Sequence, residues 1–181
     1  MPFELRGERV ILRDWRDSDL PAWVAMNADP KVRQHFMSTA SEEQASGEMR
    51  RLQAHAAEHG FTFWALEIPG LTPFAGAVGM IRTPFEAHFT PCVEIGWRLA
   101  TDWHGKGYAR EAAELALQYG FEQLGFDEVV ALTVPVNTSS WGLMERLGMR
   151  RDPADDFDHP RVPEGHPLRR HVLYRLKKDW R

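Results

Sequence analysis

The spacing of hydrophobic and polar residues changes several times along this chain, and each pattern predicts an element. Short apolar runs rich in β-branched residues are typical of strands, and they occupy residues 9–13, 62–68, 75–81, 92–99, 129–134 and 172–176. Helices are predicted over residues 20–28, from Thr39 or Ser41 to Glu58, over 108–124 and over 140–147. The second of these is polar and rich in alanine and glutamate, whereas the apolar residues of 108–124 fall near one stripe of a helix. This order indicates a mixed α/β fold and not a regular βαβ repeat.

Capping residues support several of these boundaries. Asp17-Ser18-Asp19 offers N-cap side chains for the first helix, and Pro30 follows its end. Gly60 and Gly148 stand where the second and fourth helices end, a position that favours glycine because it adopts the left-handed conformation without steric cost.

Composition narrows the class of protein. With 181 residues, of which 43% are hydrophobic, the chain is long enough to bury a core, and we expect one domain over residues 1–181. A net charge of −4 argues against non-specific binding of nucleic acid, but it leaves room for a locally acidic pocket that binds a cationic substrate. The only cysteine, Cys92, lies in an apolar strand pattern and is interpreted as a core thiol.

The hydrophobic segments of this sequence do not indicate a membrane protein. The N-terminal residues lack the apolar run of a signal peptide, and no segment approaches the roughly 20 apolar residues of a membrane-spanning helix. We therefore expect a cytoplasmic protein.

A glycine-rich turn follows the strand at 92–99 and opens the helix at 108–124. Its sequence is His104-Gly105-Lys106-Gly107-Tyr108-Ala109-Arg110. Backbone N–H groups at the start of a helix form a site for phosphate groups, and Lys106 and Arg110 add positive charge. A P-loop requires serine or threonine directly after its lysine, and here Gly107 follows Lys106. A dinucleotide-binding motif requires a third glycine at position 110, which is an arginine here. A turn that uses glycine only for its geometry stays open at this point.

A second segment identifies the family. Asn137-Thr138-Ser139-Ser140 follows a strand and leads to Glu145-Arg146-Leu147-Gly148-Met149, which together with the glycine-rich turn resembles the GNAT superfamily of N-acetyltransferases and its RimJ/RimL-like branch. Elements on both sides resemble the same branch: Leu12-Arg13, Asp19-Leu20, residues 27–32, Val172-Leu173-Tyr174 and Trp180.

The resemblance implies a fold, a reaction and a set of residues. The fold is a mostly antiparallel sheet of about six or seven strands flanked by helices, with a splayed strand pair that forms the coenzyme A cleft. The reaction moves an acetyl group from acetyl-CoA to a primary amine, by direct attack on the thioester. The residues implied to bind acetyl-CoA are Trp97, Arg98, Leu99, His104, Gly105, Lys106, Gly107, Tyr108, Ala109, Arg110, Asn137 and Ser140.

Two departures from the family pattern concern chemistry. His104 replaces the usual glutamine or arginine at the start of the loop. Met144 occupies the position of a tyrosine that protonates the leaving thiolate in many family members, and methionine donates no proton. The RimJ/RimL-like resemblance offers Ser140 instead, as a hydrogen-bond donor to the departing sulfur or as part of a water relay.

Glu94 is the candidate general base, acting directly or through water. Strand alternation places it on one face with Cys92, Gly96 and Arg98, unless a bulge changes the parity. The competing interpretation is that Glu94 only pairs with Arg98 or another cation.

The acceptor side is less defined. His35, Phe36 and Trp97 are candidates to bind the acceptor, either a protein N-terminal α-amine or a small-molecule amine. Residues 155–159 form a solvated loop or an acidic lip that attracts an amine. His55 and His59 have helical spacing but lack a third ligand, so we expect no metal.

Two alternative functions remain at this stage. Apart from acetyl transfer, the alternatives are a non-catalytic acyl-CoA-binding or regulatory module of the same fold, and an acyltransferase that uses a longer acyl-CoA. We expect a monomer or a homodimer.

Overall fold

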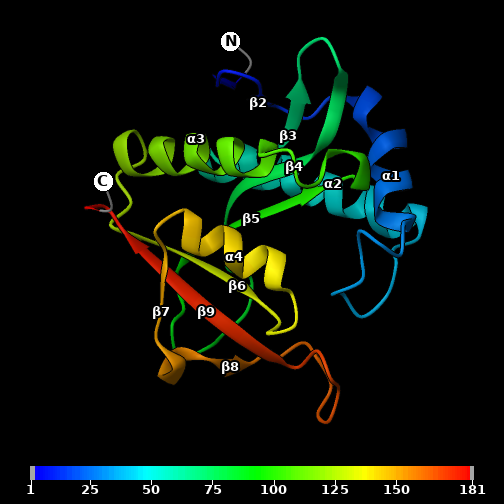
Figure 1. The fold of residues 1–181 in the computed structure, drawn as a ribbon. Coiled ribbons are helices and arrows are strands. Elements are labelled where there is room, and N and C mark those ends of the chain that lie inside the picture. Colours follow the sequence, from blue (N-terminus) through cyan, green and yellow to red (C-terminus); the bar gives the residue numbers. More distant parts are fainter. Residues whose placement is uncertain (1–2, 180–181) are drawn as a thin grey trace.

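A twisted sheet separates two layers of helices in the computed structural model, which describes residues 3–179 (Figure 1). The strands are β1 (Glu4–Arg6), β2 (Ile11–Arg13), β3 (Phe63–Ile68), β4 (Thr72–Arg82), β5 (Val93–Leu99), β6 (Glu128–Thr133), β7 (Arg150–Arg151), β8 (Phe157–Asp158) and β9 (Arg170–Lys177). The helices are α1 (Leu20–Ala28), α2 (Glu42–His59), α3 (Tyr108–Glu122) and α4 (Thr138–Arg146). Trp180 lies outside the described residues.

The sheet is mixed, as predicted, and mostly antiparallel. Its strand order is β1-β2-β3-β4-β5-β6-β9-β7, and β8 pairs with β9 outside that path. Every pair is antiparallel except β5 with β6. The described chain has nine strands and not six or seven, because β1, β7 and β8 are only two or three residues long.

The parallel neighbours β5 and β6 separate along their length. They pair in register at one position, Glu94 opposite Val130, although β5 continues to Leu99 and β6 to Thr133. On its other edge, β5 pairs with β4 over all seven of its residues. The strands therefore open away from Glu94 toward their carboxyl ends, which is the splayed pair that the family resemblance implies.

The two faces of the sheet carry separate cores. Helices α3 and α4 cover one face, where Trp64 and Leu117 are among the fully buried side chains. Helices α1 and α2 cover the other face, where Trp23 and Met49 are buried. Figure 1 shows α3 and α2 on opposite sides of the central strands. A third cluster beside β6, β8 and β9 includes Phe157, and Cys92 packs against it, in line with its interpretation as a core thiol.

Local signals explain most of the helix boundaries. Ser41 caps α2 by accepting a hydrogen bond from the Gln44 N–H, and Gly60 ends the helix in the left-handed conformation. Asp19 is the N-cap residue of α1, but its carboxylate does not cap the helix. It accepts two hydrogen bonds from the buried Arg13 guanidinium, at 2.8 and 2.9 Å. No helix in the described chain combines the length and the apolar character needed to cross a membrane.

Candidate active site

The turn between β5 and α3 presents unpaired backbone N–H groups. Gly105 and Gly107 have φ values of 70° and 84°, which residues with side chains rarely adopt. Gly107 is the N-cap of α3, and its carbonyl accepts the first helical hydrogen bond, from the Glu111 N–H at 3.1 Å. The N–H groups of residues 108–110 therefore have no acceptor within the helix. These groups, at the positive end of the helix, suit an anionic ligand.

The His104 side chain bonds to the backbone at the end of β5. Its Nε2 lies 2.8 Å from the Leu99 carbonyl oxygen, and because a carbonyl only accepts, Nε2 must donate. Its backbone N–H donates to the Thr101 carbonyl at 3.2 Å. The imidazole thus ties the end of β5 to the start of the loop, and only Nδ1 is left for another partner.

Asn137 organises the second segment as the N-cap of α4. Its Oδ1 accepts hydrogen bonds from the Ser140 N–H at 3.4 Å and the Ser139 hydroxyl at 3.1 Å. Its Nδ2 donates to the Thr133 hydroxyl at 3.0 Å, which leaves one amide hydrogen free. The Ser140 hydroxyl has no hydrogen-bond partner within residues 3–179, so it is available to a ligand.

Both segments line one cleft of about 580 Å³, beyond the point where β5 and β6 separate. The volume is in the range of ligand sites for cofactor-sized molecules. All of the residues expected to bind acetyl-CoA line it, except Lys106 and Tyr108. Lys106 instead lies over the Trp103 ring at 5.1 Å, and the Tyr108 ring also contacts Trp103.

The cleft is positive although the chain as a whole is negative. No aspartate or glutamate occurs among the described residues that line it, whereas four cationic side chains do: Lys31, Arg98, Arg110 and Arg146. Arg98 and Arg110 also pair with Glu48 and Glu114, at 3.0 and 2.9 Å. Lys31 and Arg146 make no ion pair with any described residue. The cleft therefore favours an anion over a cation.

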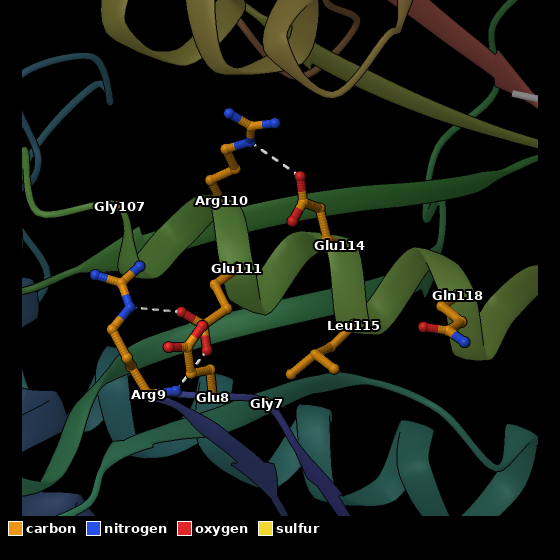
Figure 2. Close-up of a pocket in the computed structure, with 9 residues that line it drawn as sticks. All are labelled: Gly7, Glu8, Arg9, Gly107, Arg110, Glu111, Glu114, Leu115 and Gln118. Atoms are coloured by element: carbon orange, nitrogen blue, oxygen red, sulfur yellow. Dashed lines mark hydrogen bonds and ion pairs between the residues drawn. The ribbon is translucent and has the colours of Figure 1, made fainter. Parts of the chain in front are cut away.

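A second hollow of about 600 Å³, the outer hollow, lies on the other side of the glycine-rich turn (Figure 2). The turn at residues 7–9 and the exposed side of α3 form its walls, and three carboxylates line it, those of Glu8, Glu111 and Glu114. Its two cations, Arg9 and Arg110, are paired with Glu111 and Glu114. This hollow is thus poorly suited to a phosphate-bearing ligand.

Glu94 lies at the apex of the splayed strands and not in the lining of the cleft. Burial raises the pKa of its carboxyl group to about 7, although a hydrogen bond with Thr83 acts in the opposite direction. No ion pair of Glu94 occurs within the described chain, and Arg98 pairs with Glu48 instead. The interpretation that Glu94 pairs with Arg98 is therefore wrong.

The predicted alternation of β5 is confirmed. Val93, Ile95 and Leu99 belong to the core beneath α3. On the opposite face, Gly96 lies against the Phe63 ring and the Arg98 guanidinium lies 5.1 Å from the Trp23 ring.

Met144 cannot take the place of the family tyrosine in a ligand site. It is 1% exposed and packs in the core beneath α3 and α4. Ser140, one turn earlier on α4, faces the cleft.

Of the remaining candidates, His35 and Phe36 line the cleft, and the histidine pair His55 and His59 does not. His35 and Phe36 lie next to Trp97 in this lining. The His55 ring bonds to the backbone at both nitrogens, with the Phe61 carbonyl and the Arg82 N–H, and no cluster of three metal-binding side chains exists in residues 3–179.

The acidic loop does not form an open lip. Its carboxylates at positions 155, 156 and 158 all pair with arginines: Asp155 with Arg175, Asp156 with Arg151 and Asp158 with Arg170. These pairs leave little net charge to attract an amine.

Sequence reasoning missed Lys31, Leu143 and Arg146 in the cleft. Leu143 and Arg146 stand four and seven residues after Ser139 on α4, on the same side of a helix, so helical spacing carried a signal for them. Lys31 lies in an irregular segment after α1, where no periodicity indicates direction.

Comparison with known proteins agrees with this geometry. The chain matches a family described as "Acetyltransferase (GNAT) domain" over residues 9–150, and it belongs to that family. It is 34% identical to YnaD, an uncharacterized N-acetyltransferase of Bacillus subtilis, over 88 residues that are 48% of this chain and 50% of that protein.

Solved structures share the fold over nearly the whole length. An acetyltransferase from Agrobacterium tumefaciens aligns with a TM-score of 0.78 and 26% identity, covering 96% of this chain and 94% of that one. RimL, described as a ribosomal L7/L12 α-N-protein acetyltransferase, aligns with a TM-score of 0.79 and 13% identity, covering 98% and 95% of the two chains. These likenesses show that the fold is shared over nearly the whole chain.

Proposed function

We propose that this chain, acting as one domain over residues 1–181, transfers an acetyl group from acetyl-CoA to a primary amine. The acceptor is a protein N-terminal α-amine or a small-molecule amine. The observation that supports this proposal most strongly is the cleft without carboxylates between the diverging strands β5 and β6. Free N–H groups of α3 lie on one of its sides, and Asn137 with the free hydroxyl of Ser140 lies on the other.

The residues present fit a coenzyme A thioester. The N–H groups of residues 108–110 and the side chains of Arg110 and Arg146 would hold phosphate groups. The unpaired edge of β5 beyond Glu94 leaves backbone groups free to bond the amides of the pantetheine arm. The free amide hydrogen of Asn137 offers one further donor. When bound, acetyl-CoA supplies an acyl group already activated as a thioester.

Glu94 receives the proton of the attacking amine in this proposal. An α-amine has a pKa of about 7.7–8, and a carboxyl group with a pKa of about 7 is ionised at the same pH at which that amine is partly neutral. A lysine amine, with a pKa of about 10.4, would need roughly 3–4 kcal/mol more to become neutral. The pKa of Glu94 thus favours an α-amine or another weakly basic amine. Because Glu94 lies behind the cleft lining, a water relays the proton.

Ser140 and the backbone of β5 serve the thioester side. The Ser140 hydroxyl donates a hydrogen bond to the sulfur as it departs, in place of the acid that Met144 cannot supply. A backbone N–H near Trp97 stabilises the negative charge that develops on the thioester oxygen.

Two other functions make different predictions. The buried Met144 favours a non-catalytic module, because the usual proton donor is absent. A longer acyl donor requires more space beyond the sulfur. Release of free thiol separates all three possibilities.

The experiment is a thiol-release screen with acetyl-CoA against N-terminal peptides, amino acids, polyamines and aminoglycosides. Octanoyl-CoA replaces acetyl-CoA in a parallel screen, and calorimetry with CoA measures binding. We expect amine-dependent thiol release from acetyl-CoA. Binding of CoA without release in either screen would favour the non-catalytic module, and release from octanoyl-CoA alone would favour the longer donor.

A further inference from the structure

Arg9 forms a hydrogen bond with the glycine-rich turn on the side that faces the outer hollow, away from the cleft. It lies in the connection between β1 and β2, about one hundred residues before the turn in sequence, and Figure 2 shows it beside Gly107 and Glu111. Its backbone N–H donates to Glu111 Oε1 at 2.6 Å, and its Nε donates to Glu111 Oε2 at 2.8 Å. One terminal guanidinium nitrogen donates to the Lys106 carbonyl at 3.0 Å. The guanidinium carbon also lies 5.1 Å from the centre of the Tyr108 ring.

The bond to Lys106 determines the direction of the next N–H group. A trans peptide is planar, so its C=O and N–H point in opposite directions. Because Arg9 holds the Lys106 carbonyl on its own side of the turn, the Gly107 N–H points to the other side. Gly107 lines both the cleft and the outer hollow, so the turn is the wall between them.

The ion pair with Arg9 offsets the negative charge of Glu111, which would otherwise repel an anion. Glu111 lies in the first turn of α3, close to the N–H groups proposed to hold a diphosphate. An unpaired carboxylate at this place would repel phosphate groups. Arg9 occupies both of its oxygens, and the ion pair is partly shielded, since the Glu111 side chain is only 17% exposed.

Arg9 and Gly107 are packed closely, and the contacts of the guanidinium favour an arginine at position 9. A Cβ atom at Gly107 would lie 3.2 Å from a terminal nitrogen of Arg9. The planar guanidinium donates in several directions at once, toward Glu111 and the Lys106 carbonyl, which a lysine ammonium on its flexible stem reproduces only in part.

We propose that Arg9 is a positioning residue for the diphosphate of acetyl-CoA, acting through the Lys106 carbonyl and Glu111. This inference rests on the proposed function, because it takes acetyl-CoA as the ligand of the cleft. Arg9 supports binding of the diphosphate and takes no part in the transfer of the acetyl group.

The test compares two donors, acetyl-CoA and S-acetylpantetheine, which lacks the diphosphate. In Arg9→Gln, the KM for acetyl-CoA and the Kd for CoA are expected to rise about tenfold, with kcat unchanged within about twofold. The kcat/KM with S-acetylpantetheine should not change. Arg9→Lys should show a smaller loss, and Arg9→Gln/Glu111→Gln should regain part of the affinity because the unpaired carboxylate is absent.

Arg6→Gln is the matched control. Arg6 belongs to the same hairpin and pairs with Glu4, so this variant removes a surface ion pair that includes no residue of α3. It should leave every parameter unchanged. Thermal melting of each variant sets a temperature at which all of them are folded.

Three results would overturn the inference. An unchanged Kd for CoA in Arg9→Gln would show that the turn does not depend on Arg9. Equal losses with both donors would show that Arg9 stabilises the whole site and not its phosphate-binding part. A wild-type protein that binds no CoA would overturn the proposed function as well, which distinguishes that failure from the first two.

Discussion

Replacing Glu94 by glutamine retains the size of the side chain and removes its ability to accept a proton near neutral pH. The wild-type group has a pKa raised to about 7 by burial. If Glu94 is the general base, kcat/KM for an α-amine peptide should rise as pH increases through about 7. General-base catalysis contributes roughly 10²–10⁴-fold, so we expect a loss of that order at pH 8 in Glu94→Gln.

The pH profile carries the sharper information. Without a base, the remaining rate depends on how much amine is already neutral, and for an α-amine that fraction rises around pH 7.7–8. The rise in rate of Glu94→Gln should therefore occur at a pH about one unit higher than in the wild type.

The same raised pKa predicts that Glu94→Gln, although less active, is more stable than the wild type at neutral pH. The folded-state pKa of Glu94 is above its usual value of 4.5, so the fold favours the protonated form. The stability associated with that proton is fully present below about pH 4.5 and is lost as pH rises through about 7. A rise to about 7 corresponds to about 3 kcal/mol, which is an upper limit because the side chain is only partly buried. Glu94→Gln should gain stability relative to wild type by up to this amount between pH 4.5 and pH 8.

Two assays check these expectations. Thiol release at saturating acetyl-CoA, from pH 5.5 to 9.5, gives the kinetic profiles, and urea unfolding at pH 5 and pH 8 gives the free energies. Glu122→Gln, an exposed carboxylate at the far end of α3, is the control and should change neither. Superimposable kinetic profiles for wild type and Glu94→Gln would refute the role of Glu94 as a base.

Three further variants, with Gly165→Ala as a control, test separate features of the site and the core behind it. Gly107→Ala should lose about 1–2 kcal/mol of stability, because its φ is 84°, and should also raise the Kd for CoA more than tenfold. Gly165→Ala, with a φ of 78° and open space around it, should lose similar stability without affecting CoA binding. Ser140→Ala should lower kcat about tenfold and leave the unfolding free energy unchanged, since the hydroxyl has no partner among the described residues. A variant in which the unfolding free energy falls together with kcat would contradict the role of Ser140. Met144→Tyr should overfill the core and cost about 1–3 kcal/mol without raising kcat, and a rise in kcat would show that this position reaches the sulfur.

Local signals in the sequence were sufficient for most of the regular elements. Ser41 and Gly60 set the ends of α2 as predicted, and the strand at 62–68 agrees with β3 within one residue. The strands β1, β7 and β8 were missed because two or three residues contain no measurable periodicity.

The long-range polar pairs could not be predicted. Arg9 meets Glu111 across 102 residues, and Arg98 meets Glu48 across 50. Such pairs depend on how the sheet brings distant turns together, and the residue types alone allow many partners. The same holds for the acidic loop, whose charge is neutralised by arginines of β7 and β9.

The decisive measurement for the proposed cleft is a crystal structure of the protein with CoA. We expect the diphosphate to accept hydrogen bonds from the N–H groups of residues 107–110, and the pantetheine arm to lie between β5 and β6 with its amide region next to Asn137. CoA bound in the outer hollow beside Glu8 and Glu114, or a diphosphate held away from the glycine-rich turn, would contradict this expectation.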